Sequence, residues 1–373
     1  MPHRFDRIVI GGGAMGLAAA WRLASRGASV LLLERFAFGH ARGASHGATR
    51  NLNDAYADDV HLDLYARSVA LYRELEERAG RSLIARQGLV THGDPTRVGE
   101  RYAALRERGA AVEMLSASDA EARWPGMRFG GDAMLSRDAG RIDAEGVFEV
   151  LAAQARAHGA ELRANARVTR ILEEPDGVTV TVVDGEGRER TVVADGAVVA
   201  SGAWTASLVG ELVDLPRLVV TEEHPAHFSP LPAFAGAEWP SFNQLIAPAG
   251  ARGAGDVYGM FAPGEGVKVG FHRTGPEVDP DRRAFRASAE ARDALRRHVS
   301  EWFPGLDAAS AVEISCTYTT AVHGRFVLDR RGRIAIGAGF AGEGFKFAPA
   351  VGDVLADLSL GARPGPEAFA LPG

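Results

Sequence analysis

The chain is almost without cysteine: among its 373 residues, only Cys316 carries a thiol. A lone thiol has no partner for an intramolecular disulfide, so Cys316 either packs in the core or takes part in the protein's chemistry. The β-branched run around it does not decide between these two roles. A nearly cysteine-free chain fits a reducing compartment, and we expect a cytoplasmic protein.

Long apolar runs and a basic charge excess are also missing. The longest weakly polar run, residues 8–21, is interrupted by glycines and stops at Arg22, which makes it too short to span a bilayer. The N-terminus lacks the charged, apolar and small-residue regions of a signal peptide. A net charge of −6 argues against nucleic-acid and anionic-membrane partners. The eleven histidines show no ligand-like spacing with cysteine or acidic clusters, so no metal site is predicted.

The composition that is present is that of an ordinary globular protein. Hydrophobic residues make up 46% of the chain and charged residues 24%. A chain of 373 residues exceeds the size at which a single hydrophobic core stops growing. We therefore expect two domains.

The N-terminal segment predicts a β-α-β unit. Ile8 to Ile10 forms an apolar strand, residues 11–16 a glycine turn, Leu17 to Ser25 an alanine-rich helix, and Ala28 to Leu33 a second apolar strand. Continuous apolar strands are typical of a parallel sheet that is covered on both faces.

The glycine turn indicates a dinucleotide site. Gly11, Gly13 and Gly16 satisfy the G-x-G-x-x-G pattern, which lets backbone N–H groups approach a pyrophosphate at a helix N-terminus. Glu34 closes the second strand and is spaced to accept hydrogen bonds from a ribose diol, so a 2′-phosphate is disfavoured. Glycine-rich helix entries also occur for packing alone, but strand, helix and acid together favour the dinucleotide.

Two further segments favour FAD over NAD. Residues 194–204 predict a buried strand that enters a small-residue turn, and residues 337–347 place a glycine loop before a helix. A helix N-terminus aimed at a flavin ring would stabilise the negative charge of its reduced form. Each segment alone fits an ordinary strand-to-helix turn. Three such segments in one chain predict FAD.

The remaining pattern divides the chain into two interleaved parts. Val267, Val269 and Phe271 alternate with Lys268, Gly270 and His272, so one face of this strand is apolar and the other carries Lys268 and His272. Two stretches of short strands contrast with the nucleotide-type elements around them. We predict a discontinuous FAD-binding domain of residues 1–83, 141–214 and 312–373, and a substrate domain of residues 84–140 and 215–311.

With these motifs in order, the chain resembles the monomeric sarcosine oxidase and N-methyltryptophan oxidase branch of the glycine and D-amino-acid oxidase flavoproteins. The matching motifs extend from Ile8 to Leu358 and include residues 45–50, 123–126, 268–272, 315–319 and 339–352. The resemblance implies an α/β fold of two domains, with a Rossmann-like FAD-binding domain and a substrate domain on a mixed, mainly antiparallel sheet. It also implies a monomer.

The resemblance implies a reaction as well: FAD-dependent oxidation of the C–N bond of a secondary amine or N-substituted amino acid to an imine. Dioxygen is then reduced to hydrogen peroxide. The implied partners are a small amine and dioxygen. The alternatives keep the flavin: a dehydrogenase or ring-desaturating tailoring enzyme with another electron acceptor, or a catalytically silent flavin-binding protein.

Positions in the matching motifs imply functional residues. Cys316 matches the cysteine whose thiolate is joined to the 8α-methyl of FAD, with a small buried hydrophobe as the alternative. The implied catalytic residues are Arg50, Tyr258, Lys268, His272, Tyr318 and Lys346. The implied substrate contacts are Asn53, Tyr258, Glu343 and Lys346. The expected cofactor contacts are Gly11, Gly13, Ala14, Met15, Gly16, Glu34, Arg35, Ser45, His46, Thr49, Arg50, Val168, Gly202, Trp204, Cys316, Gly339, Gly342, Gly344, Phe345 and Lys346.

Three of these positions have a direct physical argument. Lys268 matches the lysine that activates oxygen near flavin N5, where a fixed ammonium stabilises superoxide in a low-dielectric pocket. Its alternative is a solvated strand lysine. His46 and Arg50 match positions against the flavin, where a cation offsets the negative charge of the reduced ring.

The chain departs from the family pattern at two substrate positions. Asn53 stands three residues after Arg50, where sarcosine-oxidising members have an arginine that pairs with the substrate carboxylate. Glu343 stands where the family usually has histidine, and it could neutralise Lys346 or attract a cationic substrate. We therefore predict a larger amine than sarcosine, such as an intermediate of specialised metabolism, whose carboxylate is absent or held only by Lys346.

Overall fold

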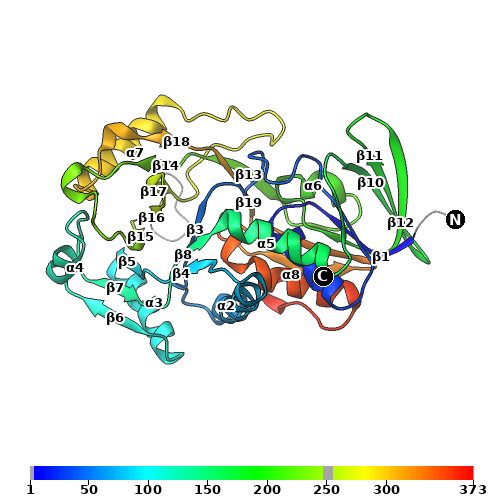
Figure 1. Ribbon diagram of the computed structural model, residues 1–373, viewed down its shortest axis with the longest axis horizontal. Helices are drawn as coiled ribbons and strands as arrows, with labels where there is room; N and C mark the ends of the chain where they lie inside the picture. The colour runs from blue at the N-terminus through cyan, green and yellow to red at the C-terminus, as the bar shows by residue number, and fades with distance from the viewer. Residues whose placement is uncertain (1–3, 247–254, 373) are drawn as a thin grey trace.

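The computed structural model places two large β-sheets side by side, with the sequence crossing between them several times (Figure 1). The structure describes residues 4–246 and 255–372. The predicted domain ranges also contain residues 1–3, 247–254 and 373, which lie outside the described residues.

The first sheet carries the N-terminal glycine turn. Its strands run in the order β10-β11-β12-β1-β2-β9, and β21 joins β12 and β20. The pairs β12–β1, β1–β2, β2–β9 and β12–β21 are parallel. Its members are β1 (Arg4–Ile10), β2 (Val30–Leu33), β9 (Glu161–Arg163), β10 (Arg167–Glu174), β11 (Gly177–Val183), β12 (Glu189–Val199), β20 (Val327–Arg331) and β21 (Ile334–Ala338).

Both faces of this sheet are buried, which explains its continuous apolar strands. Val9 and Leu32 face a core cluster shared with four helices, whereas Ile8 and Ile10 belong to a second cluster with Val209 of α6. The helices around this sheet are α1 (Ala14–Ser25), α2 (Asp59–Ala79), α5 (Ala144–Ala157), α6 (Thr205–Val209) and α8 (Ala348–Leu360).

The alanine-rich helix α1 packs closely against α8. A Cβ atom on Gly352 of α8 would lie 2.4 Å from the carbonyl carbon of Ala18, so only glycine fits this crossing. Asp353, the next residue, accepts hydrogen bonds from Arg22 and Arg26 of α1 and from Arg67 of α2. Asp357, one turn further along α8, also pairs with Arg26 and Arg67. Small residues and two carboxylates therefore hold three helices together on the sheet.

The second sheet is mixed and mainly antiparallel, as predicted. Its order is β18-β14-β17-β16-β15-β5-β7-β6, and only the pair β15–β5 is parallel. Its members are β5 (Leu89–Gly93), β6 (Val112–Leu115), β7 (Ala133–Ser136), β14 (Ala226–Phe228), β15 (Ser241–Leu245), β16 (Val257–Ala262), β17 (Gly266–Phe271) and β18 (Val312–Glu313). Helices α3 (Pro95–Glu107), α4 (Ala117–Arg123) and α7 (Ala289–Trp302) accompany it.

Short elements connect the two large sheets. One small sheet contains β3 (Thr49–Leu52), β4 (Ile84–Ala85) and β8 (Gly140–Asp143), and another pairs β13 (Leu218–Glu223) with β19 (Cys316–Ala321). β18 and β19 thus pair with strands from residues 215–311. The predicted domain boundaries stay a prediction. The 3₁₀ helices are η1 (Gly202–Trp204), η2 (Pro232–Phe234), η3 (Ala308–Ser310), η4 (Phe345–Phe347) and η5 (Glu367–Phe369).

Within residues 4–246 and 255–372, no helix has the length and apolar character needed to cross a membrane.

Candidate functional site

A cavity of about 610 Å³ extends from the glycine turn of the first sheet to the inner strands of the second. Of the predicted cofactor, catalytic and substrate residues, all except Gly16 and Thr49 line it. Residues that are more than 300 positions apart in the sequence therefore meet in one space.

The first end of the cavity is built by the turn between β1 and α1. Gly11 has φ of +103°, and a Cβ atom there would lie 2.4 Å from the carbonyl oxygen of Ala200. Both the backbone conformation and the lack of space therefore exclude a side chain. α1 has no side-chain cap at Gly13, and the backbone N–H of Ala14 donates to Ser45 Oγ at 3.1 Å. Gly16 lies behind the turn instead, because its Cβ would fall 1.8 Å from the Gly11 oxygen.

Glu34 lies beside this turn, at the end of β2. Its buried carboxylate accepts hydrogen bonds from the backbone N–H groups of Gly12 at 2.7 Å and Phe36 at 2.8 Å. Arg35 and Trp204 line the same end and share Asp281 as a partner. A glycine turn, an uncapped helix N-terminus and a carboxylate at the neighbouring strand end are the features that hold the pyrophosphate and ribose of a dinucleotide. FAD fits the residues present.

The loop before β3 is held in place by Arg50. Its guanidinium donates to the carbonyl oxygens of Thr49 and Ala44, each at 2.8 Å, and of His46 at 2.5 Å. Thr49 itself is buried outside the cavity.

His46 lines the cavity beside Arg50 as a neutral side chain. Burial, with a smaller contribution from the charge of Arg50, lowers the pKa of His46 to about 4. His46 is therefore uncharged at neutral pH, and Arg50, not His46, supplies the positive charge expected at this wall.

Lys268 extends from β17 into the centre of the cavity. Val267 and Val269 on either side of it are fully buried in the core of the second sheet, which confirms the predicted alternation. Lys268 is only 7% exposed, and no hydrogen bond or ion pair to its ammonium occurs among the described residues. Burial, with a further contribution from Arg50, lowers its pKa to about 7. Lys268 is thus a buried amine rather than a solvated strand lysine.

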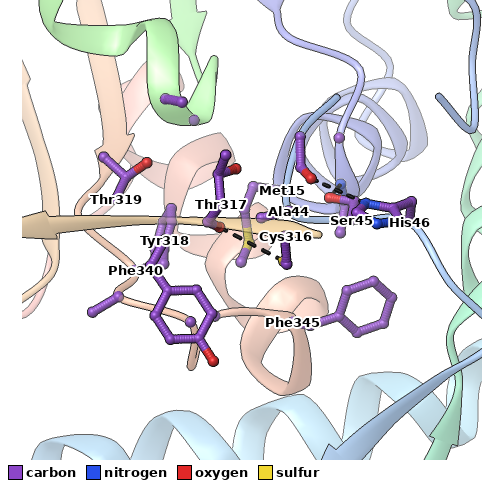
Figure 2. A pocket seen from close by; sticks show the side chains of 18 of the residues that line it. Met15, Ala44, Ser45, His46, Cys316, Thr317, Tyr318, Thr319, Phe340 and Phe345 are labelled. Carbon is purple, nitrogen blue, oxygen red and sulfur yellow. Dashed lines mark hydrogen bonds between the residues drawn. The ribbon is translucent and has the colours of Figure 1, made fainter. Parts of the chain in front are cut away.

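Cys316 begins β19 and faces the same cavity. Figure 2 shows it between Tyr318 on one side and Ser45 and His46 on the other. The thiol is partly exposed, and its nearest hydrogen-bond acceptor is the carbonyl oxygen of Thr317 at 3.8 Å, a weak contact. Cys316 is therefore not buried core filling.

Two tyrosines lie beyond the thiol. Tyr318 forms a side-chain hydrogen bond with Tyr258 of β16, and its ring centroid is 5.3 Å from that of His272. The loop after β21 closes over Tyr318 at Gly342, where φ is +78° and a Cβ atom would lie 2.2 Å from the tyrosine ring. Glycine at this position lets the backbone contact the ring directly.

The far end of the cavity contains Glu343. Its carboxylate contacts Arg273 at 3.0 Å, His272 at 3.3 Å and the hydroxyl of Tyr56 at 3.2 Å. Burial alone would raise the pKa of Glu343, but the hydrogen bond from His272 and the charges of His272 and Arg273 hold it below its usual range. Glu343 is an anion whose charge is compensated within the protein.

Lys346 lies next to Glu343 but does not contact its carboxylate. The ammonium donates to the Tyr56 hydroxyl at 2.7 Å and to the backbone oxygen of Glu343 at 2.8 Å. α2 fixes the position of η4, because Ser68 and Tyr72 donate to the backbone oxygens of Lys346 and Phe345. Burial lowers the pKa of Lys346 to about 8. Lys346 is a buried cation that faces the cavity, not a helix-start lysine in water.

Asn53 lines the wall opposite this loop. Its side-chain oxygen accepts from the N–H of Ala55 at 2.8 Å, and its amide nitrogen approaches the side-chain oxygen of Asn243 at 3.4 Å. The neighbouring Asp54 does not line the cavity; its buried carboxyl accepts a hydrogen bond from Ser136. Asp54 adds no charge to the wall.

Tyr56, Arg101, Asn243 and Arg273 are among the lining or supporting residues that were not predicted from the sequence. They lie in a loop, in α3, in the middle of β15 and just after β17, where no motif stands. Only long-range contacts bring them to the site, so no local signal identified them. In the described part of the chain, no group of three or more histidine, cysteine, aspartate or glutamate side chains could hold a metal ion.

Comparison with known proteins places this geometry in a family. The model of the family described as DAO, FAD dependent oxidoreductase, matches residues 6–358. Monomeric sarcosine oxidase of Streptomyces avermitilis is 32% identical over 96% of this chain and 94% of its own. N-methyl-L-tryptophan oxidase of Citrobacter koseri is 27% identical over 97% and 96%.

A solved structure is similar over the same extent. NikD is described as an unusual amino acid oxidase essential for nikkomycin biosynthesis. Its open form superposes on this chain with a TM-score of 0.85 and is 28% identical in sequence. The match covers 99% of this chain and 98% of the NikD chain. The relatives thus agree in length and fold with the whole chain. The chain belongs to the DAO family and is an FAD-dependent oxidoreductase of its sarcosine oxidase-like branch.

Proposed function

We propose that the protein is an amine oxidase that converts the C–N bond of an N-substituted amino acid to an imine and reduces dioxygen to hydrogen peroxide. The observation that carries the proposal is the shared cavity, in which the dinucleotide turn, the unpaired Lys268 and the cationic Lys346 face one another. The names of the relatives, which include sarcosine oxidases, N-methyl-L-tryptophan oxidase and an amino acid oxidase, support the same substrate class.

The cofactor supplies the redox chemistry: when bound, FAD accepts two electrons from the substrate and passes them to dioxygen. The chain supplies charge and position. Lys268 and Arg50 place two cations in a water-poor cavity, where a fixed positive charge stabilises developing negative charge without reorganisation. Lys268 lacks a protein counter-ion, which suits it to stabilise superoxide. We assign oxygen activation to it.

The other end of the cavity holds the substrate. Lys346 can donate to a carboxylate, while Tyr258 and Tyr318 border the space between Lys346 and Lys268. His272 orients Glu343, and neither group is required as a base when the amine binds in its neutral form. Because Asn53 offers no bidentate fork for a carboxylate, we propose a substrate larger than sarcosine.

Cys316 is proposed as the attachment point of the flavin, through a thioether to its 8α-methyl group. The exposed part of the thiol and its place on the cavity wall support this role. Acid-precipitated protein should keep its yellow colour, and its intact mass should exceed that of the bare chain by one FAD. Colour released to the supernatant would leave Cys316 as a lining residue only.

An anaerobic titration tests the oxidase. We expect N-methylated amino acids larger than sarcosine to bleach the flavin, and admitted air to restore the colour with release of one peroxide per flavin. Bleaching that persists in air but is reversed by a dye acceptor would indicate a dehydrogenase. Absence of bleaching by every secondary amine would indicate a silent flavin-binding protein. The monomeric state and the cytoplasmic location stay predictions.

A further inference from the structure

Arg101 of α3 forms part of the cavity wall on the substrate side. Its Nε donates to the carbonyl oxygen of Ala55 at 3.0 Å, and its Nη1 donates to that of Arg97 at 2.8 Å. Ala55 in turn donates its backbone N–H to the side chain of Asn53. The guanidinium is therefore fixed in orientation beside the residue that replaces the family's carboxylate-binding arginine.

The charge of Arg101 has no counter-ion among the described residues. The carboxylates that act on its charge form no ion pair with it in the described structure: Asp256 receives two hydrogen bonds from Arg97, at 2.8 and 2.6 Å, Glu343 is held by Arg273 and His272, and Glu100 is exposed on α3. A guanidinium has five N–H donors, and the two backbone carbonyls occupy two of them. Three donors are left, including both on Nη2, which is enough for a bidentate pair with an acid.

A partly buried cation without a partner lowers the free energy of unfolding. Its position therefore indicates where a ligand anion could bind. Burial lowers the pKa of Arg101, and the charge of Arg97 lowers it further, but a guanidinium stays protonated at neutral pH. A ligand anion would remove this cost by supplying the missing counter-ion. Lys346 is the other cation on this side of the cavity without a carboxylate partner at ion-pair distance in the described structure.

We propose that Arg101 forms a second anion subsite, so that the substrate is an N-substituted amino acid with two acidic groups, one held by Lys346 and the other by Arg101. This inference rests on the proposed function for the identity of the reaction, but not for the subsite itself. It explains how the chain can bind an acidic substrate although residue 53 is an asparagine and not the family's arginine. Sarcosine has a single carboxylate and leaves Arg101 uncompensated.

Ligand binding tests the subsite without turnover. Oxidised holoenzyme is titrated with acetate, succinate and glutarate while the flavin absorbance is followed. We expect a dicarboxylate to bind at least tenfold more tightly than acetate. In Arg101→Gln that advantage should disappear while the acetate affinity stays within about twofold, because a charge-assisted bidentate pair contributes roughly tenfold or more in affinity. Arg101→Lys should retain part of the advantage.

The control is Arg106→Gln, on the same helix, where an exposed guanidinium donates to the hydroxyl of Tyr102 and lies over its ring. It should bind all three acids as the parent does. Flavin content and the unfolding midpoint of each variant show whether it is folded. Equal weakening of acetate and dicarboxylates in Arg101→Gln, or no weakening of either, overturns the proposal.

Turnover gives a second readout. N-methylaspartate or N-methylglutamate should exceed sarcosine in kcat/KM, and Arg101→Gln should raise KM for them with little change in kcat, because Arg101 is assigned to the second acid and not to the bond that reacts. If no amine reduces the flavin but the dicarboxylate titration succeeds, the oxidase proposal fails and the anion subsite stands. If amines reduce the flavin but Arg101→Gln binds dicarboxylates normally, the oxidase proposal stands and the anion subsite fails.

Discussion

At the scale of single residues, the site is defined by which charges lack a partner. Glu343 is buried but compensated by Arg273 and His272, whereas Lys268 and Arg101 have no carboxylate at ion-pair distance among the described residues. Buried charges are normally paired, since desolvation is costly. Lys346 lacks such a partner as well. These three cations therefore mark where anionic species are expected: superoxide at Lys268, and the two acids of the substrate at Lys346 and Arg101.

Replacement of Lys268 by methionine should slow the reaction with oxygen selectively. Removal of one fixed charge that stabilises a developing anion costs about a hundredfold or more in rate. We expect the second-order rate of flavin reoxidation, measured by stopped-flow after anaerobic reduction, to fall by about that factor. The rate of anaerobic reduction by the amine should change far less.

The pH dependence provides the control for this variant. Burial lowers the pKa of Lys268 to about 7, so its cationic fraction, and with it the reoxidation rate, should decline as pH rises through about 7. Lys268→Met should lose this dependence, and Lys268→Arg should keep fast reoxidation at higher pH. Unchanged oxygen reactivity in Lys268→Met would contradict the assignment.

Asp54 predicts a pH effect on stability that is independent of catalysis. Burial raises the pKa of Asp54 to about 6, and one of its carboxyl oxygens has no hydrogen-bond partner. The folded state therefore holds this proton more tightly than the unfolded chain, so the stability that Asp54 contributes is present below about pH 4 and lost as pH rises through about 6.

Asp54→Asn removes the titration. From pH 4 to pH 7 the parent should lose about 3 kcal/mol of unfolding free energy relative to the variant, since one pKa unit corresponds to about 1.4 kcal/mol. Urea denaturation at several pH values measures this change. A constant difference across this range would refute the buried titration.

The residues of the cofactor site could be predicted because their chemistry is encoded locally. Gly11, Glu34 and Lys268 lie in patterns of strand, turn and alternation that are only a few residues long. The partners of Glu343 could not be predicted in this way: Tyr56 is 287 residues away in sequence, and Arg273 is 70. Which charge meets which depends on the tertiary fold, so the sequence left open whether Glu343 neutralises Lys346.

At the scale of elements, the sequence predicted those with strong periodicity and clear ends. The helix predicted from Leu17 to Ser25 is α1, which begins earlier, at Ala14, and ends at Ser25 as expected. The flanking apolar strands that the sequence predicted correspond to β1 and β2. The sequence did not predict that β5 pairs with β15 in parallel. Local patterns carry no information about pairing between strands so far apart. The 3₁₀ turn η4 that orients Lys346 was also missed, because its three residues resemble the start of α8.

The contacts of Asp353 predict how much the packing of α1, α2 and α8 depends on this carboxylate. Burial alone would raise the pKa of Asp353, but its hydrogen bond to Arg22 and the charges of Arg22 and Arg67 lower it. Its side chain is 9% exposed, so solvent screens these interactions little. Asp353→Asn should lower the unfolding free energy at pH 7 by about 3 kcal/mol, because Arg22 loses its carboxylate at 2.6 Å while Arg26 and Arg67 keep only Asp357.

The sign of the pH effect follows from the lowered pKa. The stability contributed by Asp353 is present above the ordinary aspartate pKa of 3.8 and is lost as pH falls through its folded value. The difference between variant and parent in denaturant titrations should therefore shrink below about pH 4. Glu186→Gln, which breaks an exposed pair with Arg188, should change stability by less than about 0.5 kcal/mol. A similarly small effect of Asp353→Asn would show that the three helices do not need the carboxylate.

At the scale of the whole molecule, the cavity is lined by elements from both large sheets and from the short strands between them. Its walls come from the turn before α1, the loop before β3, strands β16, β17 and β19, and the loop after β21. In Figure 1, β3 and β19 lie between β16 and β17 on one side and β1 on the other. A ligand that fills this cavity contacts both sheets at once, so its binding energy adds to the stability of the folded molecule.

Cys316→Ala should therefore make the stability of the whole protein depend on the FAD concentration. With a covalent flavin, added FAD has no free site, and the unfolding temperature of the parent should not change. In the variant the flavin exchanges with solution, and free FAD at a hundred times its Kd should raise the unfolding free energy by about 2.7 kcal/mol relative to the stripped protein. Thermal melts over a series of FAD concentrations measure this, with Ser315→Ala as a neighbouring control that should follow the parent. A parent protein whose unfolding temperature also rises with added FAD would show that Cys316 forms no tether, while the contribution of the flavin to the fold would remain.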